Sequence, residues 1–304
     1  MALFIIVAPI FALILLGWVA RRFGLVKESA VDVLTGFVYY IALPALIVQS
    51  LLSIQWDANS FFALTTTSGL LLVMCAVVFM GLSVFVKDRQ VRASFFLIAV
   101  IANTVYMGYP IMAGFFGHAT AGTVAAIAVL QLVIGVLAGL VAMEYWIDRR
   151  VSVVVCAQCV SVNPLFISVV AGIIASMIPS LFAFAIIAKP LSMLAATASP
   201  VALFALGAFM YAKFNQSHFG LVLGASLFKV AVMPLVAFVV LRAIGLTGEA
   251  FSAAVICAGM PVAITAFVFS QQSKLKGSLV GSAIIVSTVM SFITLPIALL
   301  ILSR

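Results

Sequence analysis

Charged residues are scarce in this sequence. Asp, Glu, Lys and Arg together make up 7% of the 304 residues, whereas a soluble domain carries about a quarter. Hydrophobic residues make up 66%, and the mean hydropathy is +1.40. A soluble core cannot hide this much apolar surface. The composition therefore excludes a soluble globular protein and indicates an all-α integral membrane protein.

Acidic residues are missing from the middle of every apolar run. The sequence therefore offers no carboxylate at mid-membrane depth. His118 and His218 also lie near the ends of apolar runs, which argues against a proton relay. The acidic residues are Glu28, Asp32, Asp57, Asp88, Glu144, Asp148 and Glu249.

Motifs of catalysis and metal binding are missing as well. The sequence has no H-E-x-x-H, no G-x-S-x-G and no paired carboxylates, so we expect neither an enzyme nor a cofactor. Cys156-Ala-Gln-Cys159 is a lone C-x-x-C without a neighbouring His, and we interpret it as a coincidence rather than a metal or redox site. The net charge is +8, but the basic residues lie in short loops without interleaved aromatics. We expect no nucleic-acid partner.

Apolar runs separated by charged or Gly/Pro-marked breaks predict ten transmembrane helices. The first run, Leu3 to Ala20, lacks a preceding positive region, so we interpret it as a retained span rather than a signal peptide. The predicted limits are 2–20, 31–54, 61–86, 93–116, 121–147, 162–179, 188–212, 218–242, 250–272 and 278–302.

Lys and Arg are distributed unevenly between the loops. The loops that follow even-numbered spans and the C-terminus hold only Lys189, Arg242 and Arg304, and Lys229 lies inside a span. By the positive-inside rule, the loops after odd-numbered spans are cytoplasmic and both termini lie on the outer side of the inner (plasma) membrane. The basic residues of those loops are Arg21, Arg22, Lys27, Lys87, Arg89, Arg92, Arg149, Arg150, Lys213, Lys274 and Lys276.

The two halves of the chain repeat a proline pattern. Both the fourth and the ninth predicted spans carry Gly-x-Pro, at Gly108-Tyr109-Pro110 and Gly259-Met260-Pro261. Because each half has an odd number of spans, the halves enter the membrane from opposite sides and form inverted repeats. We expect a first five-helix repeat over 1–147, a cytoplasmic linker over 148–161 and an inverted second repeat over 162–304. The matched prolines are Pro9 with Pro164, Pro44 with Pro200, and Pro110 with Pro261.

Each Gly-x-Pro predicts a broken helix. Proline removes a backbone donor and clashes with the preceding turn, and the freed groups cannot face lipid. Broken helices at matching positions of inverted repeats indicate a substrate site, and their exposed N-termini suit an anion such as a carboxylate. At Pro44, Pro200, Pro234 and Pro296 we expect simple kinks.

Several segments resemble one membrane-protein family. Asn103-Thr-x-x-Met107-Gly108-x-Pro110-Ile resembles the fourth helix of the auxin efflux carrier family, which includes the plant PIN exporters. Met260-Pro261-Val-Ala-Ile-Thr-Ala-Phe267-Val268-Phe269 is similar to the ninth helix of the family. Further similar segments are Val129-Leu130-Gln131, Phe204-Ala-Leu-Gly207-Ala-Phe-Met, Lys229 placed before Pro234, and Thr294-Leu295-Pro296-Ile297.

The resemblance implies a fold, a function and a site. The implied fold is that of PIN exporters and bile-acid symporters, with inverted five-helix repeats and spans 4 and 9 crossing in mid-membrane. The implied function is transport of small organic anions such as auxin, malonate or malate, and the short linker is closer to bacterial members. Thr35 departs from the family, whose members often have Asn at this position. The implied substrate residues are Asn103, Ile111, Gln131 and Ile264.

Polar side chains near the predicted breaks are the other candidates. Asn103 and Gln131 can bond either substrate or freed backbone groups, whereas Thr104 and Thr265 are more typical of helix packing. Lys229 can attract an anion or cap helix carbonyls. The predicted substrate-binding set is Asn103, Thr104, Gly108, Pro110, Ile111, Gln131, Lys229, Gly259, Pro261 and Ile264, with no metal ligand.

We therefore expect a carrier in the lipid bilayer that moves a small carboxylate by alternating access. Cation-coupled carriers with crossed, broken helices often use mid-membrane carboxylates, and this sequence offers none, so we expect a uniporter, or coupling through backbone carbonyls and polar side chains. A sodium- or proton-coupled symporter of the bile-acid-symporter type, or a non-transporting receptor or scaffold, stays open. A channel is disfavoured because no ring-forming charges or filter-like repeats occur. Gly135-x-x-x-Gly139 permits close helix contact, either within the chain or between the protomers of a homodimer.

Overall fold

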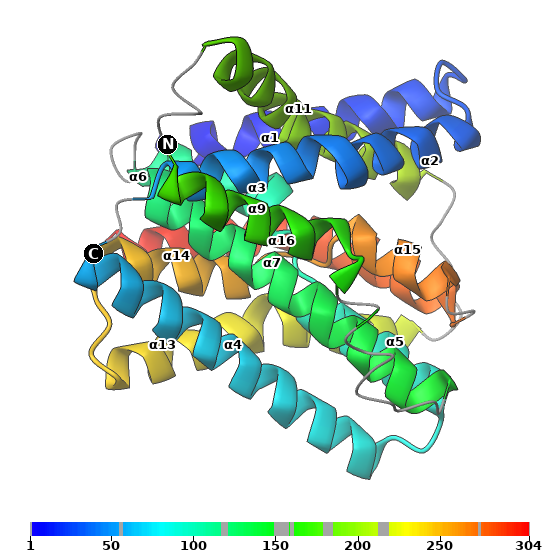
Figure 1. Cartoon of the computed structure of the whole chain (residues 1–304). Coiled ribbons are helices and arrows are strands. Elements are labelled where there is room, and N and C mark those ends of the chain that lie inside the picture. Colours follow the sequence, from blue (N-terminus) through cyan, green and yellow to red (C-terminus); the bar gives the residue numbers. More distant parts are fainter. Residues whose placement is uncertain are drawn as a thin grey trace.

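All the regular elements in the described part of the chain are helices (Figure 1). The computed structural model describes residues 2–54, 57–116, 121–148, 158, 161–178, 185–211, 219–272 and 275–303. The C-x-x-C at Cys156 and Cys159 lies outside the described residues, as does nearly all of the predicted linker 148–161.

The described residues form eighteen helical elements, and those labelled η are π-helical. They are α1 (Ala2–Arg22), α2 (Glu28–Phe37), η1 (Val38–Ala42), α3 (Leu43–Leu52), α4 (Ala58–Phe85), α5 (Arg89–Val100), η2 (Thr104–Gly108), α6 (Tyr109–Phe116), α7 (Ala121–Met143), η4 (Glu144–Asp148), α9 (Pro164–Met177), α11 (Ala185–Met210), α12 (Phe219–Leu227), η5 (Phe228–Val232), α13 (Met233–Ala243), α14 (Gly248–Ala258), α15 (Ile264–Gln272) and α16 (Gly277–Leu302).

Seven helical stretches of the described residues are long and apolar enough to cross a membrane. The stretches Pro164–Met177 and Gly248–Ala258 are apolar but shorter, and the predicted spans 93–116 and 250–272 are each divided in two. This is the architecture of a multi-pass membrane protein, and the ten-span inverted repeat stays a prediction. The seven stretches are Ile5–Arg22, Glu28–Leu52, Ala58–Phe85, Thr123–Ile147, Ile186–Met210, Phe219–Ala243 and Gly277–Leu302.

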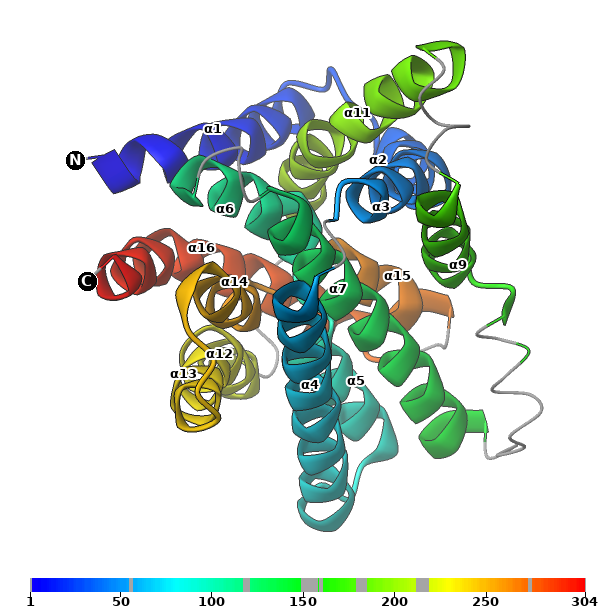
Figure 2. The same cartoon turned by 60° about the vertical axis from the view of Figure 1, so that its left-hand side comes forward.

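The helices pack as two groups. The first helix group comprises α1, α2, η1, α3, α9 and α11, in which α11 contacts α1, α2 and α3, and α9 packs on α3. The second helix group comprises α4 to α7 and α12 to α16, in which α7 contacts α4, α5 and α14, and α16 contacts α5, α12 and α15. Figure 2 shows the first group along the upper and right-hand sides of the view, with α9 at the right. The groups meet where α3 packs on α7, α1 on α16 and α11 on η2.

Three of the π-helical turns each end two residues before a proline. The turns η1, η2 and η5 precede Pro44, Pro110 and Pro234, and each proline is the second residue of the following α-helix. A proline ring clashes with the carbonyl four residues earlier, and the wider π-turn gives it room. The kinks predicted at Pro44 and Pro234 thus take the form of π-turns, whereas Pro200 and Pro296 lie inside α11 and α16.

The π-turn η2 frees one carbonyl, and α11 supplies its partner. The Tyr109 N–H donates to Thr104 O, so Val105 O would be the next acceptor in the π pattern, but Pro110 has no N–H to donate. The Ser199 hydroxyl donates to Val105 O over 3.5 Å. A polar group of the first helix group therefore serves the proline break of the second, as a buried backbone in a membrane protein requires.

The helices α1 and α11 cross with their backbones in contact. A Cβ atom on Gly17 would lie 2.0 Å from Phe204 O, and one on Gly207 would lie 1.8 Å from Ile14 O. Real Cβ atoms essentially never approach other atoms this closely. Only glycine at both positions permits this crossing, which holds the first helix group together.

Gly135 and Gly139 of α7 allow a close contact with α5 of the same chain. A Cβ atom on Gly135 would lie 2.3 Å from Val100 O, and one on Gly139 would lie 2.9 Å from the Leu97 side chain. The predicted small-residue motif of α7 therefore packs on the C-terminal end of α5.

We expect Gly207→Ala to lower the melting temperature of the detergent-purified protein. The added methyl group must push α1 away from α11, and such overpacking typically costs about 1–3 kcal/mol. Gly224→Ala in α12 is the matched control, because a Cβ atom there meets nothing within 4 Å and alanine favours the helix. A Gly207→Ala protein that melts at or above the temperature of the control would contradict the close crossing.

Candidate functional site

Two of the predicted spans are interrupted. Residues 101–103 separate α5 from η2, and residues 259–263 separate α14 from α15. In the ninth span Pro261 lies within the break. In the fourth span the break lies upstream of Pro110, because η2 already accommodates the proline. The position of that break differs from the predicted one: Asn103 lies in the break and Thr104 begins η2, rather than both preceding it.

The two breaks pair with each other through an isolated antiparallel β-bridge. The Asn103 N–H donates to Pro261 O over 2.8 Å, and the Ala263 N–H donates to Ile101 O over 3.0 Å. Ala102 and Val262 form the bridge between these bonds. Both segments are buried. Backbone groups that a helix would otherwise satisfy internally therefore satisfy each other here.

The helix α16 supports this crossing with a hydroxyl. Ser287 Oγ accepts a hydrogen bond from the Val262 N–H over 3.1 Å and donates to Ile284 O over 3.2 Å. Sequence reasoning did not single out Ser287. Its signal is the cluster of small polar residues Ser287, Thr288 and Ser291 in a mostly apolar helix, and all three are buried.

The Asn103 side chain does not serve the freed backbone. Asn103 is 2% exposed and caps η2 without a side-chain hydrogen bond. Its Oδ1 atom has no partner among the described residues, and neither do Thr265 Oγ1 and Thr288 Oγ1. Thr104 differs, because its hydroxyl donates to Ala128 O of α7 over 2.7 Å. The Thr104 hydroxyl thus joins η2 to α7, whereas the Thr265 hydroxyl makes no such contact with the described residues.

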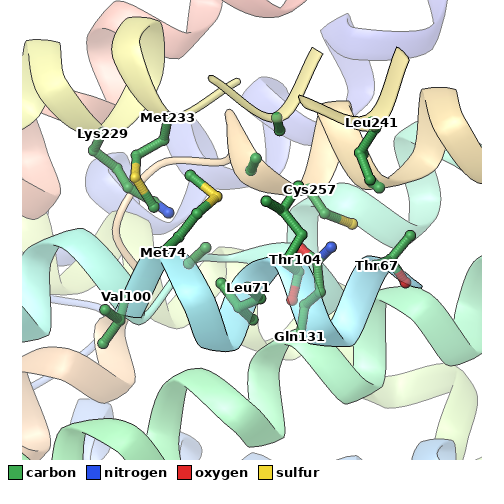
Figure 3. Close-up of a pocket in the computed structure, with 15 residues that line it drawn as sticks. Thr67, Leu71, Met74, Val100, Thr104, Gln131, Lys229, Met233, Leu241 and Cys257 are labelled. Atoms are coloured by element: carbon green, nitrogen blue, oxygen red, sulfur yellow. The ribbon is translucent and has the colours of Figure 1, made fainter. Parts of the chain in front are cut away.

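A small cavity of about 20 Å³ lies beside the crossing (Figure 3). It has room for about one water molecule, so it is too small for a carboxylate in this conformation. Of the predicted residues, Thr104, Gln131 and Lys229 line it. Sequence reasoning did not include Thr67 or Cys257, which line it from α4 and α14, since nothing in their local sequence shows that these helices meet.

A second cavity of about 100 Å³ adjoins the start of α15. It places Ile264, a predicted substrate residue, beside Thr35 of α2 and the charged Arg21 and Asp32. Four of the ten predicted residues thus line two separate cavities: Thr104, Gln131 and Lys229 line the first, and Ile264 lines the second. The other predicted residues contribute to packing around the breaks: Gly108 lies against Met260, Gly259 lies against Pro234, Pro261 accepts the backbone bond, and Ile111 is fully buried.

Lys229 is buried within the π-turn η5. It is 2% exposed, and in Figure 3 its nitrogen points between Met74 and Met233. Its ammonium group forms no ion pair and no hydrogen bond with any residue that the structure describes. Burying a cation without a partner costs free energy. A lysine at this position is therefore more typical of a functional residue than of a packing residue.

An ion pair outside the apolar region connects the two broken spans. Lys276 Nζ, which precedes α16, donates to Asp88 Oδ2 over 2.8 Å, and Asp88 caps α5 through the Gln90 and Val91 N–H groups. The bond from Lys276, followed by the bonds from the helix, lowers the pKa of the Asp88 carboxyl below its usual value. The loop before α5 is therefore tied to the loop after α15.

The sequence matches one family model, described as membrane transport protein, over residues 2–152 and 149–299. The chain belongs to this family. It is the auxin efflux carrier family that the helix motifs predicted, so the resemblance is confirmed.

Two archaeal relatives extend over nearly the whole chain. An uncharacterized transporter of Methanocaldococcus jannaschii is 25% identical over 95% of this chain and 96% of its own length. An uncharacterized transporter of Methanothermobacter thermautotrophicus is 25% identical over 96% of this chain and 95% of its own length. With the apolar helices, the family identifies a multi-pass membrane transporter rather than an enzyme.

We expect Ser287→Ala to destabilise the crossing. Removing the hydroxyl leaves the Val262 N–H buried without an acceptor, which typically costs about 1–3 kcal/mol. The measurement is the melting temperature in detergent. Ser83→Ala is the matched control, because Ser83 Oγ bonds only the Phe79 carbonyl of its own helix. Equal melting temperatures for the two variants would contradict the role of Ser287.

We expect the pair of Asp88 and Lys276 to stabilise the protein only above acidic pH. Because the folded state lowers the pKa of Asp88 below its ordinary value of 3.8, its contribution is complete above that value and is lost as the pH falls through the lowered pKa. Melting curves from pH 7 downwards should show Asp88→Asn less stable than the parent near neutral pH, with the difference shrinking below pH 3.8. A difference that is constant over this range would argue against the ion pair.

Proposed function

We propose that the protein is a secondary carrier for a small organic anion, such as a malonate-like or auxin-like carboxylate, and that it binds the anion where the two broken spans cross. The observation that carries the proposal is the unpartnered polar group of Asn103, buried at the pairing of residues 101–103 with 259–263. A buried polar group without a partner is uncommon in a folded protein. Asn103 Oδ1 is an acceptor, so its partner would be a donor on the substrate, such as a hydroxyl or an N–H group, while the Nδ2 group of the same amide can donate to the carboxylate.

The charges at the crossing favour an anion. The helices that begin at Thr104 and Ile264 both start at the crossing, and the first N–H groups of a helix have no acceptor within it and carry partial positive charge. Lys229 adds a full positive charge at the adjacent cavity. The described residues that line this cavity include no carboxylate. The proposed site comprises Asn103, Thr104, Gly108, Pro110, Ile111, Gln131, Lys229, Gly259, Pro261 and Ile264.

An inverted repeat accounts for the way the helices pair. Predicted spans 1 and 2 pack with 6 and 7 in the first helix group, and spans 3 to 5 pack with 8 to 10 in the second. The family model also matches in two consecutive stretches that meet near residue 150. These features support two five-helix repeats with both termini on the outer side, as the distribution of Lys and Arg favours.

The size and position of the cavities support alternating access. The cavity at the crossing holds about one water molecule, and the described residues that line it all belong to the second helix group, so a carboxylate would bind there only after these helices move apart. The larger cavity beside Ile264 lies between the two helix groups, where a movement of one group against the other would change its size. The close contacts of α1 with α11 and of α7 with α5 keep each group rigid, and the contacts between the groups are fewer. Rocking of one group against the other would open the crossing to each side in turn.

We expect a thermal-shift screen of the purified protein to find at least one mono- or dicarboxylate that raises its melting temperature. A ligand at about 100 times its Kd stabilises the folded state by about 2.7 kcal/mol. Asn103→Ala should abolish this shift, because it removes the proposed hydrogen-bonding partner. Asn163→Ala is the matched control, since Asn163 is also buried but caps α9, and it should retain the shift.

An acid whose shift survives Asn103→Ala would remove Asn103 from the site. Uptake of the identified acid into proteoliposomes then separates the classes of function. Saturable uptake is expected of a carrier, a shift or uptake that requires sodium would indicate the coupled symporter, and the absence of both shift and uptake for every acid would favour a receptor or scaffold.

A further inference from the structure

The cavity beside the crossing brings Lys229 to the C-terminal ends of two helices. Val100, the last residue of α5, and Cys257 and Ala258 at the end of α14 line the same cavity as Lys229. The last carbonyl groups of a helix have no donor within it and carry partial negative charge. Lys229 therefore shares a cavity with two such ends. The carbonyl groups of Leu97, Val255, Ile256 and Cys257 already accept backbone N–H groups, so the ammonium group interacts with the partial negative charge of the helix ends rather than through a direct hydrogen bond.

The surroundings of Lys229 contain no other full charge to balance it. The described residues that line the cavity are otherwise apolar or neutral polar. The titratable side chains that interact with Lys229 are the thiols of Cys75 in α4 and Cys257 in α14, which are neutral when protonated. The helix ends are thus the negative partners that the fold offers to the buried ammonium group.

The π-turn places this lysine. The Met233 N–H donates to Phe228 O, so the next carbonyl of the turn, that of Lys229 itself, would need a donor from Pro234, which has none. The widened turn shifts the register of η5 relative to α13 by one residue. Lys229 is thereby buried and directed into the cavity, while Val232 in the same turn is exposed.

In coupled carriers, half-helix C-terminal ends and unwound carbonyls coordinate the driving cation. We propose that the Lys229 ammonium takes the place of such a cation in this protein. A covalently attached positive charge then neutralises the ends of α5 and α14 and attracts the anion, and transport needs no sodium. This inference rests on the proposed carrier function and specifies its coupling: the cation of the site is part of the chain.

The test compares variants that remove the charge in different ways. Lys229→Ala removes the ammonium and leaves space for a small cation from solution, Lys229→Met fills that space with a neutral chain, and Lys229→Arg keeps the charge. Lys189→Ala is the matched control, because Lys189 is an exposed lysine of α11. Each protein is reconstituted in buffers of equal ionic strength that contain choline, sodium or methylammonium.

For the parent and for Lys189→Ala, uptake and melting temperature should be the same in all three buffers. Lys229→Ala should lose at least tenfold in uptake in choline and recover in sodium or methylammonium, with a parallel rise in its melting temperature. Lys229→Met should lose uptake without recovery in any buffer. Lys229→Arg should retain uptake that is independent of the buffer.

Two results would overturn the inference. One is a parent protein whose uptake or melting temperature depends on sodium, because a resident ammonium leaves no place for that ion. The other is a folded Lys229→Met that transports in choline as fast as the parent. If the Lys229 variants do not fold, the comparison of the parent protein in sodium and in choline still tests the inference. If no acid is transported by any variant, the proposed function fails, whereas the cation dependence of the melting temperature of Lys229→Ala still tests the role of Lys229.

Discussion

The structure depends on the backbone pairing between residues 101–103 and 259–263. Neither segment could stop being helical in a membrane alone, because its N–H and C=O groups would face an apolar environment without partners. Each segment instead supplies the bonds that the other lacks, through Asn103 with Pro261 and Ala263 with Ile101. The two breaks are thus one structural unit, although they are far apart in the sequence.

This unit explains why polar and charged groups gather at the same place. Two helices end and two others begin within a few residues of this pairing. Their N-terminal ends, with partial positive charge, and their C-terminal ends, with partial negative charge, therefore lie close together. The N-terminal ends suit an anion, and the C-terminal ends suit the ammonium of Lys229 at the adjoining cavity. A carrier built this way needs few charged side chains, which agrees with a sequence that has only 7% of them.

Local sequence predicted the interrupted spans but not their details. Gly-x-Pro indicated which spans break, because proline removes a donor wherever it occurs in a helix. The upstream shift of the first break could not be predicted, since it depends on whether a π-turn accommodates Pro110. The residues that line the cavity together, such as Thr67 and Cys257, could not be predicted either, because they come from different helices. Lys229 was recognisable because a charge inside an apolar run is conspicuous by itself.

The bond from Ser199 to Val105 O is a polar contact between the two helix groups. If the groups slide past each other, this carbonyl loses its hydroxyl and must find another donor, and water is the donor that an opening cavity admits. Displacement of the helices and wetting of the break would then occur together.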